Sequence, residues 1–514
     1  MSAFRNDSRL AWNASLSIDQ KPTIARKSSI ICTIGPASQS VETMTKLLLA
    51  GMSIMRMNFS HGSYEYHAQT IENLRTAQTL VSVPPVAIAL DTKGPEIRTG
   101  NMKNGDVPFN TGHEMIFTTD DALKSEGCLE QIYIDYKNLP KVLSVGKTIY
   151  IDDGIMEFET LEIHDDHIKV RAVNSGVLAS HKGVNLPGSN IDLPALSKKD
   201  IADLHFGIEQ GVDMIFASFI RKAQDVADIR ATLGEQGKHI KIVSKIESTE
   251  GVKNFDEILE ATDAVMIARG DLGIEIPAAN VFMAQKSMIT KCNIAGKPAI
   301  CATQMLESMT YNPRPTRAEV SDVANAILDG ADCVMLSGET AKGKYPLEAV
   351  NMMSETAILA EMSICYSSLL KDMRDTLTGP LDPTEATCLA AVGASFEQDA
   401  KLIICLSKSG TSARLLAKYR PEAPILVLTR SPSVARNSHL SRGCYPVVYD
   451  DESLKSGDDA VSGAVWQKGV DSRIEYAVQH AISRNLCKKG DNVIVIQGWR
   501  GGVGNTNTMR IISA

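Results

Sequence analysis

The sequence predicts an α/β protein: a (β/α)8 TIM barrel that carries an inserted all-β lid domain and is followed by a C-terminal α/β domain with an open sheet. Short β-branched, apolar runs alternate with longer amphipathic runs from residue 27 to 360, which is typical of parallel strands joined by helices. The alternation is interrupted between residues 94 and 191. A second helix–strand alternation follows residue 361.

The barrel is predicted from strand-like runs that mostly lead into helical periodicity. The runs are Ser29–Gly35, Ser53–Phe59, Val86–Thr92, Met214–Phe219, Lys241–Glu247, Ala264–Gly270, Ala299–Met305 and Cys333–Glu339. Eight strand–helix units are what a closed barrel needs. Helices are predicted over Val41–Ala50, Ser63–Ser82 and Val281–Ala295. The barrel domain therefore covers residues 27–93 and 192–360, after an N-terminal segment of residues 1–26.

The inserted domain, residues 94–191, is rich in Gly, Asp, Thr and Val. Its strands are predicted at Met115–Thr119, Lys147–Ile151, Met156–Ile163 and Ile168–Val173. The barrel resumes with Ser197 as a helix N-cap, followed by Asp200. The C-terminal domain, residues 361–514, has its predicted elements at Thr384–Glu397, Lys401–Leu406, Ser412–Lys418, Ile425–Leu428, Val447–Tyr449, Ser472–Asn485 and Asp491–Ile496.

Composition narrows the class of protein. At 514 residues the chain is long enough for about three domains. The net charge of −8 disfavours binding to nucleic acid or to an anionic membrane, although a local basic pocket can still bind a small anion. The ten cysteines form no CxxC pair, which favours reduced thiols over disulfides or zinc. No apolar run approaches the ~18 residues of a membrane span, so we expect a cytoplasmic enzyme.

Polar side chains gather where the predicted barrel strands end, which is where barrel enzymes place their chemistry. Arg56, Asn58 and Ser60 are two residues apart, so a strand would put them on one face. A guanidinium with two neutral oxygen groups suits an anion beside a hard cation. Taken alone, a solvated polar strand end is the simpler interpretation of this run.

Two further strand ends offer oxygen ligands. The third strand ends in Asp91 and Thr92, and Arg98 follows as a second hydrogen-bond donor for a phosphate group. A capped strand and a Gly-Pro turn would also explain these residues. Thr303, at the end of the seventh strand, could bond a substrate oxygen or an enol, although a lone threonine there is usually structural.

Charged residues end the fifth and sixth strands. Lys245 and Glu247 share a face, and Asp271 directly follows its strand. A buried lysine beside a carboxylate can be an acid, a base or a fixed positive charge, and a structural ion pair fits this run equally well. Glu247 and Asp271 could share a divalent cation and leave positions for water and substrate, as is typical of Mg²⁺.

Together these groups suit a highly charged phosphorylated substrate bound through a metal ion. Chemistry on such a substrate consists mostly of positioning and charge neutralisation. The barrel contains no Walker-A sequence and no GxGxxG between a strand and a helix, so nucleotide binding must use another mode.

The chain resembles the pyruvate kinase family over about residues 27–514. The motifs that carry the resemblance are CTIGPAS (32–38), MNFSHG (57–62), LDTKGPEIRTG (90–100), KGVNLPG (182–188), SKIES (244–248), ARGDLGIEIP (268–277), ATQMLESM (302–309), RPTRAEVSDVANA (314–326) and LSGETAKGKYP (336–346). The resemblance implies a cytoplasmic homotetramer (EC 2.7.1.40) that transfers phosphoryl from phosphoenolpyruvate to ADP, the last step of glycolysis. It also implies a barrel, a β lid and a regulatory C-terminal domain.

The resemblance implies roles for matching residues. The implied catalytic and substrate-binding residues are Arg56, Arg98, Lys245, Gly270, Asp271 and Thr303. Among them, Lys245 would neutralise the transferring phosphoryl group, and Thr303 would lie near the face where the enolate is protonated through water. The implied nucleotide-binding residues are Asn58, His61, Arg98 and Lys182.

The resemblance also implies two cations. Glu247 and Asp271 would bind Mg²⁺ (or Mn²⁺) between the enzyme and phosphoenolpyruvate. The implied K⁺ ligands are Asn58, Ser60, Asp91 and Thr92. Family members with a glutamate at Glu96 tend to need K⁺, because a cation beside that carboxylate supports the anionic substrate. We therefore expect K⁺ dependence.

A second ligand site is expected in the C-terminal domain. Ser407, Lys408, Ser409, Gly410, Thr411 and Ser412 link a strand to a helix N-terminus, where amides and hydroxyls can bind phosphate. This loop resembles the sugar-phosphate effector loop of regulated members, and Trp466 and Arg473 fall where some members contact fructose bisphosphate. Val503 and Asn505 depart from the pattern of fructose-bisphosphate responders, so the effector stays open. An N-capped helix without a ligand is the alternative.

Two other functions compete with the kinase. One is a barrel aldolase or lyase that uses phosphoenolpyruvate or pyruvate with Mg²⁺; the β insertion and the K⁺-type cluster argue against it. The other is a catalytically inactive metabolite sensor, which the intact Lys245, Glu247 and Asp271 disfavour.

Overall fold

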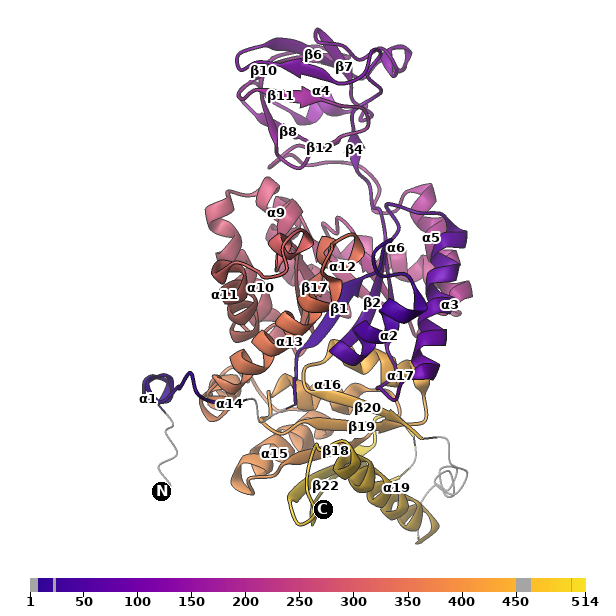
Figure 1. Cartoon of the computed structure of the whole chain (residues 1–514), viewed down its shortest axis with the longest axis vertical. Helices are drawn as coiled ribbons and strands as arrows, with labels where there is room; N and C mark the ends of the chain where they lie inside the picture. Colours follow the sequence, from indigo (N-terminus) through magenta and orange to yellow (C-terminus); the bar gives the residue numbers. More distant parts are fainter. Residues whose placement is uncertain (1–7, 22–24, 450–463, 501) are drawn as a thin grey trace.

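The computed structural model describes residues 8–21, 25–449, 464–500 and 502–514. Figure 1 shows an elongated molecule in three tiers: a β domain at the top on a narrow neck, the barrel in the middle and the C-terminal α/β domain below. The short helix α1 (Arg9–Ala14) lies to one side, where Trp12 Nε1 donates to the carbonyl of Ser363 at 2.9 Å. Among the described residues, no helix is long and apolar enough to cross a membrane.

The predicted barrel is confirmed. Its strands close in the order β1-β17-β16-β15-β14-β13-β3-β2, and every neighbouring pair is parallel. The strands are β1 (Ser29–Thr33), β2 (Met52–Asn58), β3 (Ala87–Asp91), β13 (Met214–Ala217), β14 (Lys241–Ile246), β15 (Ala264–Ala268), β16 (Ala299–Ala302) and β17 (Cys333–Leu336). Helices cover their outer faces, so both faces are buried and the strands are almost continuously apolar.

Local signals start and stop the barrel helices. Ser40 accepts a hydrogen bond from Thr43 N at the start of α2, and Gly51, with φ 111°, ends it in a conformation that favours glycine. The predicted N-cap at Ser197 is confirmed as a capping box with Asp200. The elements are α2 (Val41–Ala50), α3 (Tyr64–Leu80), α5 (Lys198–Gln210), α6 (Ala223–Leu233), α7 (Thr249–Lys253), α8 (Phe255–Ala261), α9 (Arg269–Glu275), η2 (Ala278–Asn280), α10 (Val281–Ala295), η3 (Glu307–Thr310), α11 (Arg317–Leu328), α12 (Gly338–Ala341) and α13 (Pro346–Met362).

The inserted domain forms its own sheet and core. A seven-stranded sheet runs β4-β12-β8-β9-β10-β6-β7, and β5 and β11 form a separate pair. Phe117 and Phe158 pack edge to face in its core. The two- and three-residue strands and the two short helices were not predicted, because such short elements carry no readable periodicity. The elements are β4 (Ile97–Arg98), β5 (Val107–Phe109), β6 (Glu114–Thr118), η1 (Asp121–Leu123), β7 (Gln131–Tyr133), α4 (Leu139–Val142), β8 (Thr148–Ile151), β9 (Met156–Ile163), β10 (His167–Ala172), β11 (Gly176–Leu178) and β12 (Gly183–Asn185).

The C-terminal domain is the predicted open α/β sheet, in the order β20-β19-β18-β21-β22. The edge strand β22 is antiparallel to β21 and was not predicted. The strands are β18 (Leu402–Leu406), β19 (Ile425–Thr429), β20 (Cys444–Val448), β21 (Asn492–Gly498) and β22 (Thr506–Ser513). The helices are α14 (Tyr366–Asp375), α15 (Pro383–Glu397), α16 (Thr411–Lys418), α17 (Pro432–Asn437), η4 (Ser438–Leu440) and α19 (Ala464–Ser483). The core includes Leu370 and Met373 of α14, so this helix packs with the C-terminal domain.

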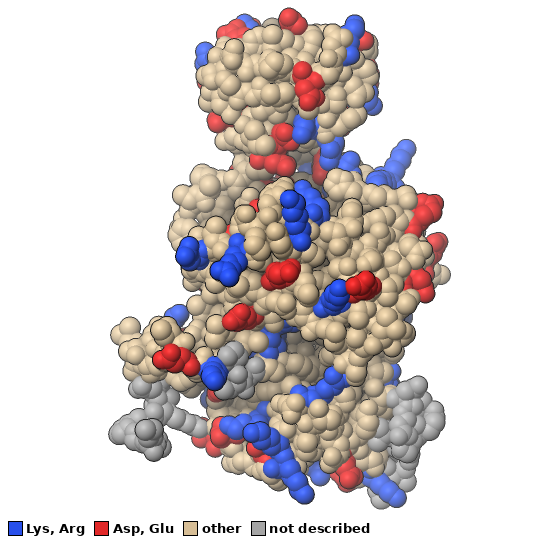
Figure 2. Space-filling view, in the orientation of Figure 1, with Lys and Arg blue, Asp and Glu red and all other residues tan. Residues whose placement is uncertain are grey.

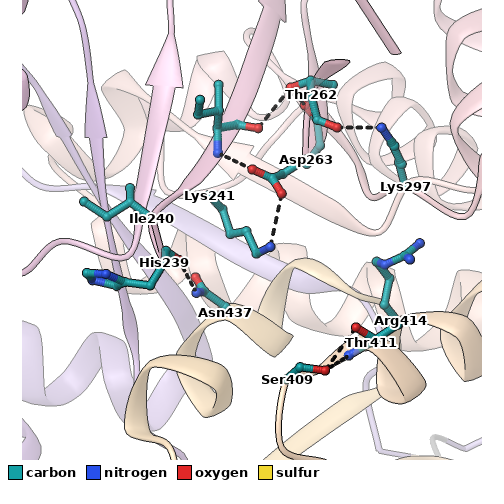
Figure 3. Close-up of polar contacts among 12 residues, drawn as sticks. His239, Ile240, Lys241, Thr262, Asp263, Lys297, Ser409, Thr411, Arg414 and Asn437 are labelled. Carbon is teal, nitrogen blue, oxygen red and sulfur yellow. Dashed lines mark hydrogen bonds and ion pairs between the residues drawn. The ribbon is translucent and has the colours of Figure 1, made fainter. Parts of the chain in front are cut away.

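Three barrel strands are each preceded by an aspartate at the base of the barrel, and each aspartate bonds the strand beside its own. Asp213, Asp263 and Asp332 accept hydrogen bonds from backbone N–H groups of neighbouring strands, at 2.9, 3.0 and 3.0 Å. Figure 3 shows the second of these, where Asp263 also bonds Lys241 Nζ at 3.1 Å. These carboxylates give the base of the barrel a row of negative charge, in which Asp213 and Asp332 are buried and Asp263 is partly exposed.

The C-terminal domain uses that row as its docking point. Arg436 Nε lies 2.8 Å from Asp213, and Arg420 Nη1 lies 2.7 Å from Asp332. Arg420 and Asp332 are both about 4% exposed, so neither charge has water as an alternative partner. The two domains are therefore held together by one desolvated ion pair, Arg420–Asp332, and one partly exposed pair, Arg436–Asp213, as well as by apolar contact.

We predict that Asp332→Ala lowers the stability of the domain junction strongly. The substitution leaves the Arg420 guanidinium buried without its carboxylate, which costs about 3–5 kcal/mol. Urea unfolding followed by limited proteolysis between the domains measures the effect. The matched control is Glu235→Ala, which removes the carboxylate of an exposed pair with Lys238, and it should unfold like the wild type. Equal unfolding midpoints for both variants would contradict the assignment.

Candidate active site

The mouth of the barrel holds a buried cluster built on Asp91. Residues Asn58 and Asp91 are register partners on β2 and β3, so the strand pairing itself puts these two strand ends together. Arg56 Nε donates to Asp91 Oδ2 at 2.6 Å and Arg56 Nη1 donates to Thr33 Oγ1 at 2.8 Å. Burial raises the pKa of Asp91, but Arg56 and Lys245 outweigh burial and hold this pKa below its usual value.

Lys245 extends the cluster to the next strand. Its ammonium lies 3.1 Å from Asp91 Oδ1, 3.0 Å from Glu247 Oε1 and 2.8 Å from Ser218 Oγ. Burial lowers the pKa of Lys245, but Asp91 and Glu247 together raise it above its usual value. Of the three roles that the sequence left open for this lysine (acid, base or fixed positive charge), the raised pKa favours a fixed positive charge at neutral pH.

Glu247, which is buried, and Asp271, which is partly buried, form a pair of adjacent carboxylates. Glu247 Oε2 accepts a hydrogen bond from Phe219 N at 2.6 Å, and Asp271 sits in the first turn of α9. Burial and the charge of Glu247 raise the pKa of Asp271 to about 7. Two like charges held this close fit a divalent cation between them. The described residues contain no group of three or more Asp, Glu, His or Cys side chains that could hold a metal, so substrate and water oxygens would complete the site.

Thr303 and Gly270 meet at the ends of β16 and β15. A Cβ on Gly270 would lie 2.7 Å from Thr303 Cγ2, so only glycine allows this approach. Thr303 and Gln304 have φ angles of 74° and 56°. Such angles are rare for a β-branched residue and cost on the order of 1–3 kcal/mol each, which structures retain mainly at functional sites.

The four predicted K⁺ ligands lie at neighbouring strand ends. Asn58 Oδ1 accepts from Ser60 N at 3.1 Å, and Thr92 Oγ1 accepts from Ser218 N at 3.1 Å. The Asp91 carboxylate already receives Arg56, Lys245 and Ser218. Sequence reasoning missed Ser218. Its signal was its position at the end of the fourth strand, the same signal that indicated the others.

A cleft of about 420 Å³ lies between the lid and the barrel mouth. It brings Asp271 together with His61, Arg98 and Lys182, the residues expected to meet the nucleotide. Figure 2 shows charged side chains at the narrow junction above the barrel.

The polar residues on the lid side of the cleft are themselves tied down. The Arg98 guanidinium bonds Glu96 and the carbonyl of His181, and Lys182 Nζ lies 3.0 Å from Asp152. Arg221 donates to the carbonyls of Ile191 and Leu193, where the chain returns from the lid. Arg98 therefore belongs to the lid, whereas Arg56 belongs to the floor of the site.

A larger cavity of about 840 Å³ lies in the C-terminal domain beside the loop before α16. Of the residues expected to bind an effector, the cavity is lined by Ser407, Lys408, Ser409, Thr411, Ser412, Trp466 and Arg473. Gly410 shapes the loop: its φ is 83°, and its N–H donates to Ser407 Oγ at 3.0 Å. Arg473 stacks 5.1 Å from the Trp466 ring. Val503 and Asn505 line the same cavity; Gly501 lies outside the described residues.

The fold and the mouth of the barrel define a class of protein: a barrel phosphotransferase with a lid, a buried lysine and a carboxylate pair for a divalent cation. The model "Pyruvate kinase, barrel domain" matches residues 25–350, and "Pyruvate kinase, alpha/beta domain" matches residues 385–512. The pyruvate kinase of Schizosaccharomyces pombe is 59% identical, over 98% of each chain. That of Candida albicans is 56% identical over 99% of each, and that of Debaryomyces hansenii is 55% identical over 99% of this chain and all of its own. The chain belongs to the pyruvate kinase family.

We predict that Mg²⁺ binding to the free enzyme weakens as the pH falls below about 7. A metal needs the Asp271 carboxylate deprotonated, and protons compete once the pH is below its raised pKa. The affinity should fall by up to about ten-fold per pH unit, with proton release on binding, as measured by calorimetry in buffers of different ionisation enthalpy. Asp271→Asn should weaken binding and remove its pH dependence, whereas the exposed control Asp256→Asn should keep both. An affinity for Mg²⁺ that does not change between pH 8 and pH 6 would contradict the prediction.

Proposed function

We propose that the chain transfers the phosphoryl group of phosphoenolpyruvate to ADP at the mouth of its barrel, with the strand-end cluster as the catalytic machinery. The observation that carries this proposal is Lys245, buried and kept charged between Asp91 and Glu247. Transfer breaks the bond between phosphorus and the enol oxygen and forms a bond to a β-phosphate oxygen of ADP. The enolate then takes up one proton at its methylene carbon and becomes pyruvate.

Charge balance supports a divalent cation at Glu247 and Asp271. Arg56 and Lys245 supply two positive charges against the three carboxylates Asp91, Glu247 and Asp271. That leaves one negative charge in the cluster, which is unfavourable for a phosphorylated carboxylate. Bound Mg²⁺ or Mn²⁺ would neutralise charge on the substrate oxygens and bridge them to the protein. The pair of adjacent carboxylates fits such an ion.

The chain's own groups have distinct tasks. Lys245 and Arg56 hold positive charge beside the transferring phosphoryl group. The first turn of α9, at Gly270 and Asp271, presents backbone N–H groups that suit the substrate carboxylate. The Thr303 hydroxyl stands beside Gly270, near where the enolate would be protonated through water.

ADP would occupy the cleft under the lid. His61, Arg98 and Lys182 line this cleft, and Asn58 lies at the strand end below it. A bound diphosphate would thus have the cations Arg98 and Lys182 on its lid side and the proposed metal site on its barrel side. Lys245 and Asp271 would then lie between the two substrates, as in-line transfer needs.

K⁺ is the second cation proposed, held by Asn58, Ser60, Asp91 and Thr92. These groups are neighbouring oxygen donors at the ends of β2 and β3. Glu96 adds negative charge at the lid hinge, partly balanced by Arg98 and Lys93. A monovalent cation there would add the positive charge that an anionic substrate needs.

The cavity beside Ser407–Ser412 is proposed to bind a sugar phosphate that regulates activity. Small hydroxyl side chains and the start of α16 offer donors for a phosphate, and the Trp466–Arg473 stack offers a flat partner for a second group. Residues 361–514 would thus form the regulatory domain. An N-capped helix without a ligand remains the alternative interpretation.

A cytoplasmic homotetramer acting in the last step of glycolysis completes the proposal. Its support is exposed apolar surface: Phe282 and Met283 on α10 are 57% and 52% exposed, and Met509 and Ile511 face outwards on the edge strand β22. Helix faces and strand edges of this kind are usually covered by a partner.

The decisive test of the active site is Lys245→Met assayed for pyruvate and ATP formation from phosphoenolpyruvate and ADP. Loss of the fixed charge should lower kcat by at least about 10²–10³-fold. The matched control is Lys241→Met at the other end of the same strand, which should keep wild-type kcat. Unchanged activity in Lys245→Met would contradict the proposed role of Lys245 as the charge that stabilises the transferring phosphoryl group.

The K⁺ proposal is tested in the same assay with K⁺ replaced by a large organic cation. Activity should fall strongly, because such a cation cannot fit among the oxygen groups at the ends of β2 and β3. Thr92→Val should raise the K⁺ concentration needed for half-maximal rate. Equal rates in both salts would contradict the proposed K⁺ site but would leave the proposed kinase activity intact.

The effector proposal is tested by phosphoenolpyruvate saturation with fructose 1,6-bisphosphate and with sugar monophosphates. An activating sugar phosphate should lower the half-saturating phosphoenolpyruvate concentration in the wild type. Ser409→Asp places a negative charge in the exposed part of the loop and should abolish that shift, with basal kcat unchanged. Ser483→Asp, exposed on α19, is the control. A response that survives in Ser409→Asp would place the effector elsewhere.

A further inference from the structure

Arg269 follows β15, and its five N–H donors bond the end of β16 and the helices α10 and α11. The residue opens α9, but its guanidinium reaches across to the end of β16. Nε donates to the carbonyl of Ala302 at 3.2 Å, and Nη2 donates to the carbonyl of Thr303 at 2.8 Å. Nη1 lies 3.3 Å from Gln285 Oε1. The remaining N–H groups meet a carboxylate.

That carboxylate is Asp322 of α11. Its two oxygens each lie 2.7 Å from a different terminal nitrogen of Arg269, in the fork geometry that fixes both the plane and the rotation of a guanidinium. The Arg269 side chain is 12% exposed and that of Asp322 is 34% exposed. The pair therefore sits at the edge of the core, where its geometry counts for more than its charge.

The carbonyl that Arg269 holds belongs to the strained residue of the site. Thr303 and Gln304 both have positive φ angles, and the bond to the Thr303 carbonyl fixes the peptide between them. Thr303 also approaches Gly270, the residue next to Arg269, so closely that a Cβ on Gly270 would lie 2.7 Å from Thr303 Cγ2. One side chain thus ties the strained peptide to the loop that carries Asp271.

We propose that Arg269, aligned by Asp322, is a positioning residue that sets the Thr303 hydroxyl for proton delivery to the enolate. The inference rests on the proposed role of Thr303. Lysine at this position keeps the charge but lacks the planar fork, so it cannot bond Asp322 through two nitrogens and the Thr303 carbonyl together. Phosphoryl transfer depends on Lys245, Glu247 and Asp271, and the Arg269 guanidinium bonds none of these side chains directly. The two halves of the reaction should respond differently.

The experiment compares those halves in Arg269→Lys. ATP formation from phosphoenolpyruvate and ADP reports phosphoryl transfer. Exchange of the methyl protons of pyruvate with deuterium oxide, followed by NMR with Mg²⁺, K⁺ and ATP present, reports proton transfer at carbon. The exchange rate should fall at least about ten-fold more than the rate of ATP formation. Asp322→Asn should show the same pattern more weakly.

Arg230→Lys is the matched control. Arg230 also bonds an aspartate and a backbone carbonyl, Asp263 at 2.5 Å and Ile240 at 2.8 Å, but at the base of the barrel. It should leave the ratio of exchange to ATP formation at the wild-type value, even where its melting temperature falls as far as that of Arg269→Lys. A role of Arg269 in stability alone predicts the same ratio in both variants, and that result would overturn the proposal.

The double variant Arg269→Lys/Thr303→Ala tests whether Arg269 acts through Thr303. Its exchange rate should equal that of Thr303→Ala alone; additive losses would overturn the proposal. Thr303→Ala with wild-type exchange would overturn both the role of Thr303 and this inference. A wild-type protein that makes no ATP would overturn the proposed function itself. A wild-type ratio in Arg269→Lys, with Thr303→Ala impaired, would overturn the inference alone.

Discussion

The active site depends on one constraint: the Asp91 carboxylate, almost fully buried, between the cations of Arg56 and Lys245. A buried carboxylate without partners would bind a proton, and the two cations without it would repel each other. Together the three groups keep fixed charges at the barrel mouth. Glu247 pairs with Lys245 and so continues the row of alternating charges. Asp271 then adds a negative charge beyond those that Arg56 and Lys245 balance, and a metal ion would fit there.

The two ends of the barrel use the same kind of residue differently. At the mouth, carboxylates follow the strands and share cations whose charge is available to a substrate. At the base, aspartates precede the strands, bond backbone N–H groups of neighbouring strands and bind arginines from the C-terminal domain. The base therefore gives the mouth a rigid support and ties it to the domain that holds the second cavity.

That second cavity lies close to the barrel base. Arg414 follows the loop at the start of α16, and its guanidinium donates to the carbonyl of Gly296 at the end of α10. Figure 3 places Ser409, Thr411 and Arg414 near the barrel residues Asp263 and Lys297. The helix that this loop opens thus contacts the barrel base through the hydrogen bond from Arg414 to Gly296.

Much of the architecture could be predicted from the sequence because its signals are local. Each barrel strand is a short apolar run, and the bounds of α2 and α10 were predicted residue for residue. The two- and three-residue strands of the lid were missed because their pairing partners, such as β4 with β12, are distant in the chain. The edge strand β22 was missed for a related reason: its alternating exposure follows from pairing with β21.

For the site, the sequence by itself determined which residue types stand at the strand ends, and so the class of substrate and the candidate ligands. Tertiary structure decided what these residues do to one another. It showed that Lys245 stays charged, that Arg98 belongs to the lid and that Ser218 joins the cluster. It also revealed Arg269 holding a strained Thr303. The physical reason is that charge state and backbone strain depend on burial and on partners from other strands, which only folding brings within contact distance.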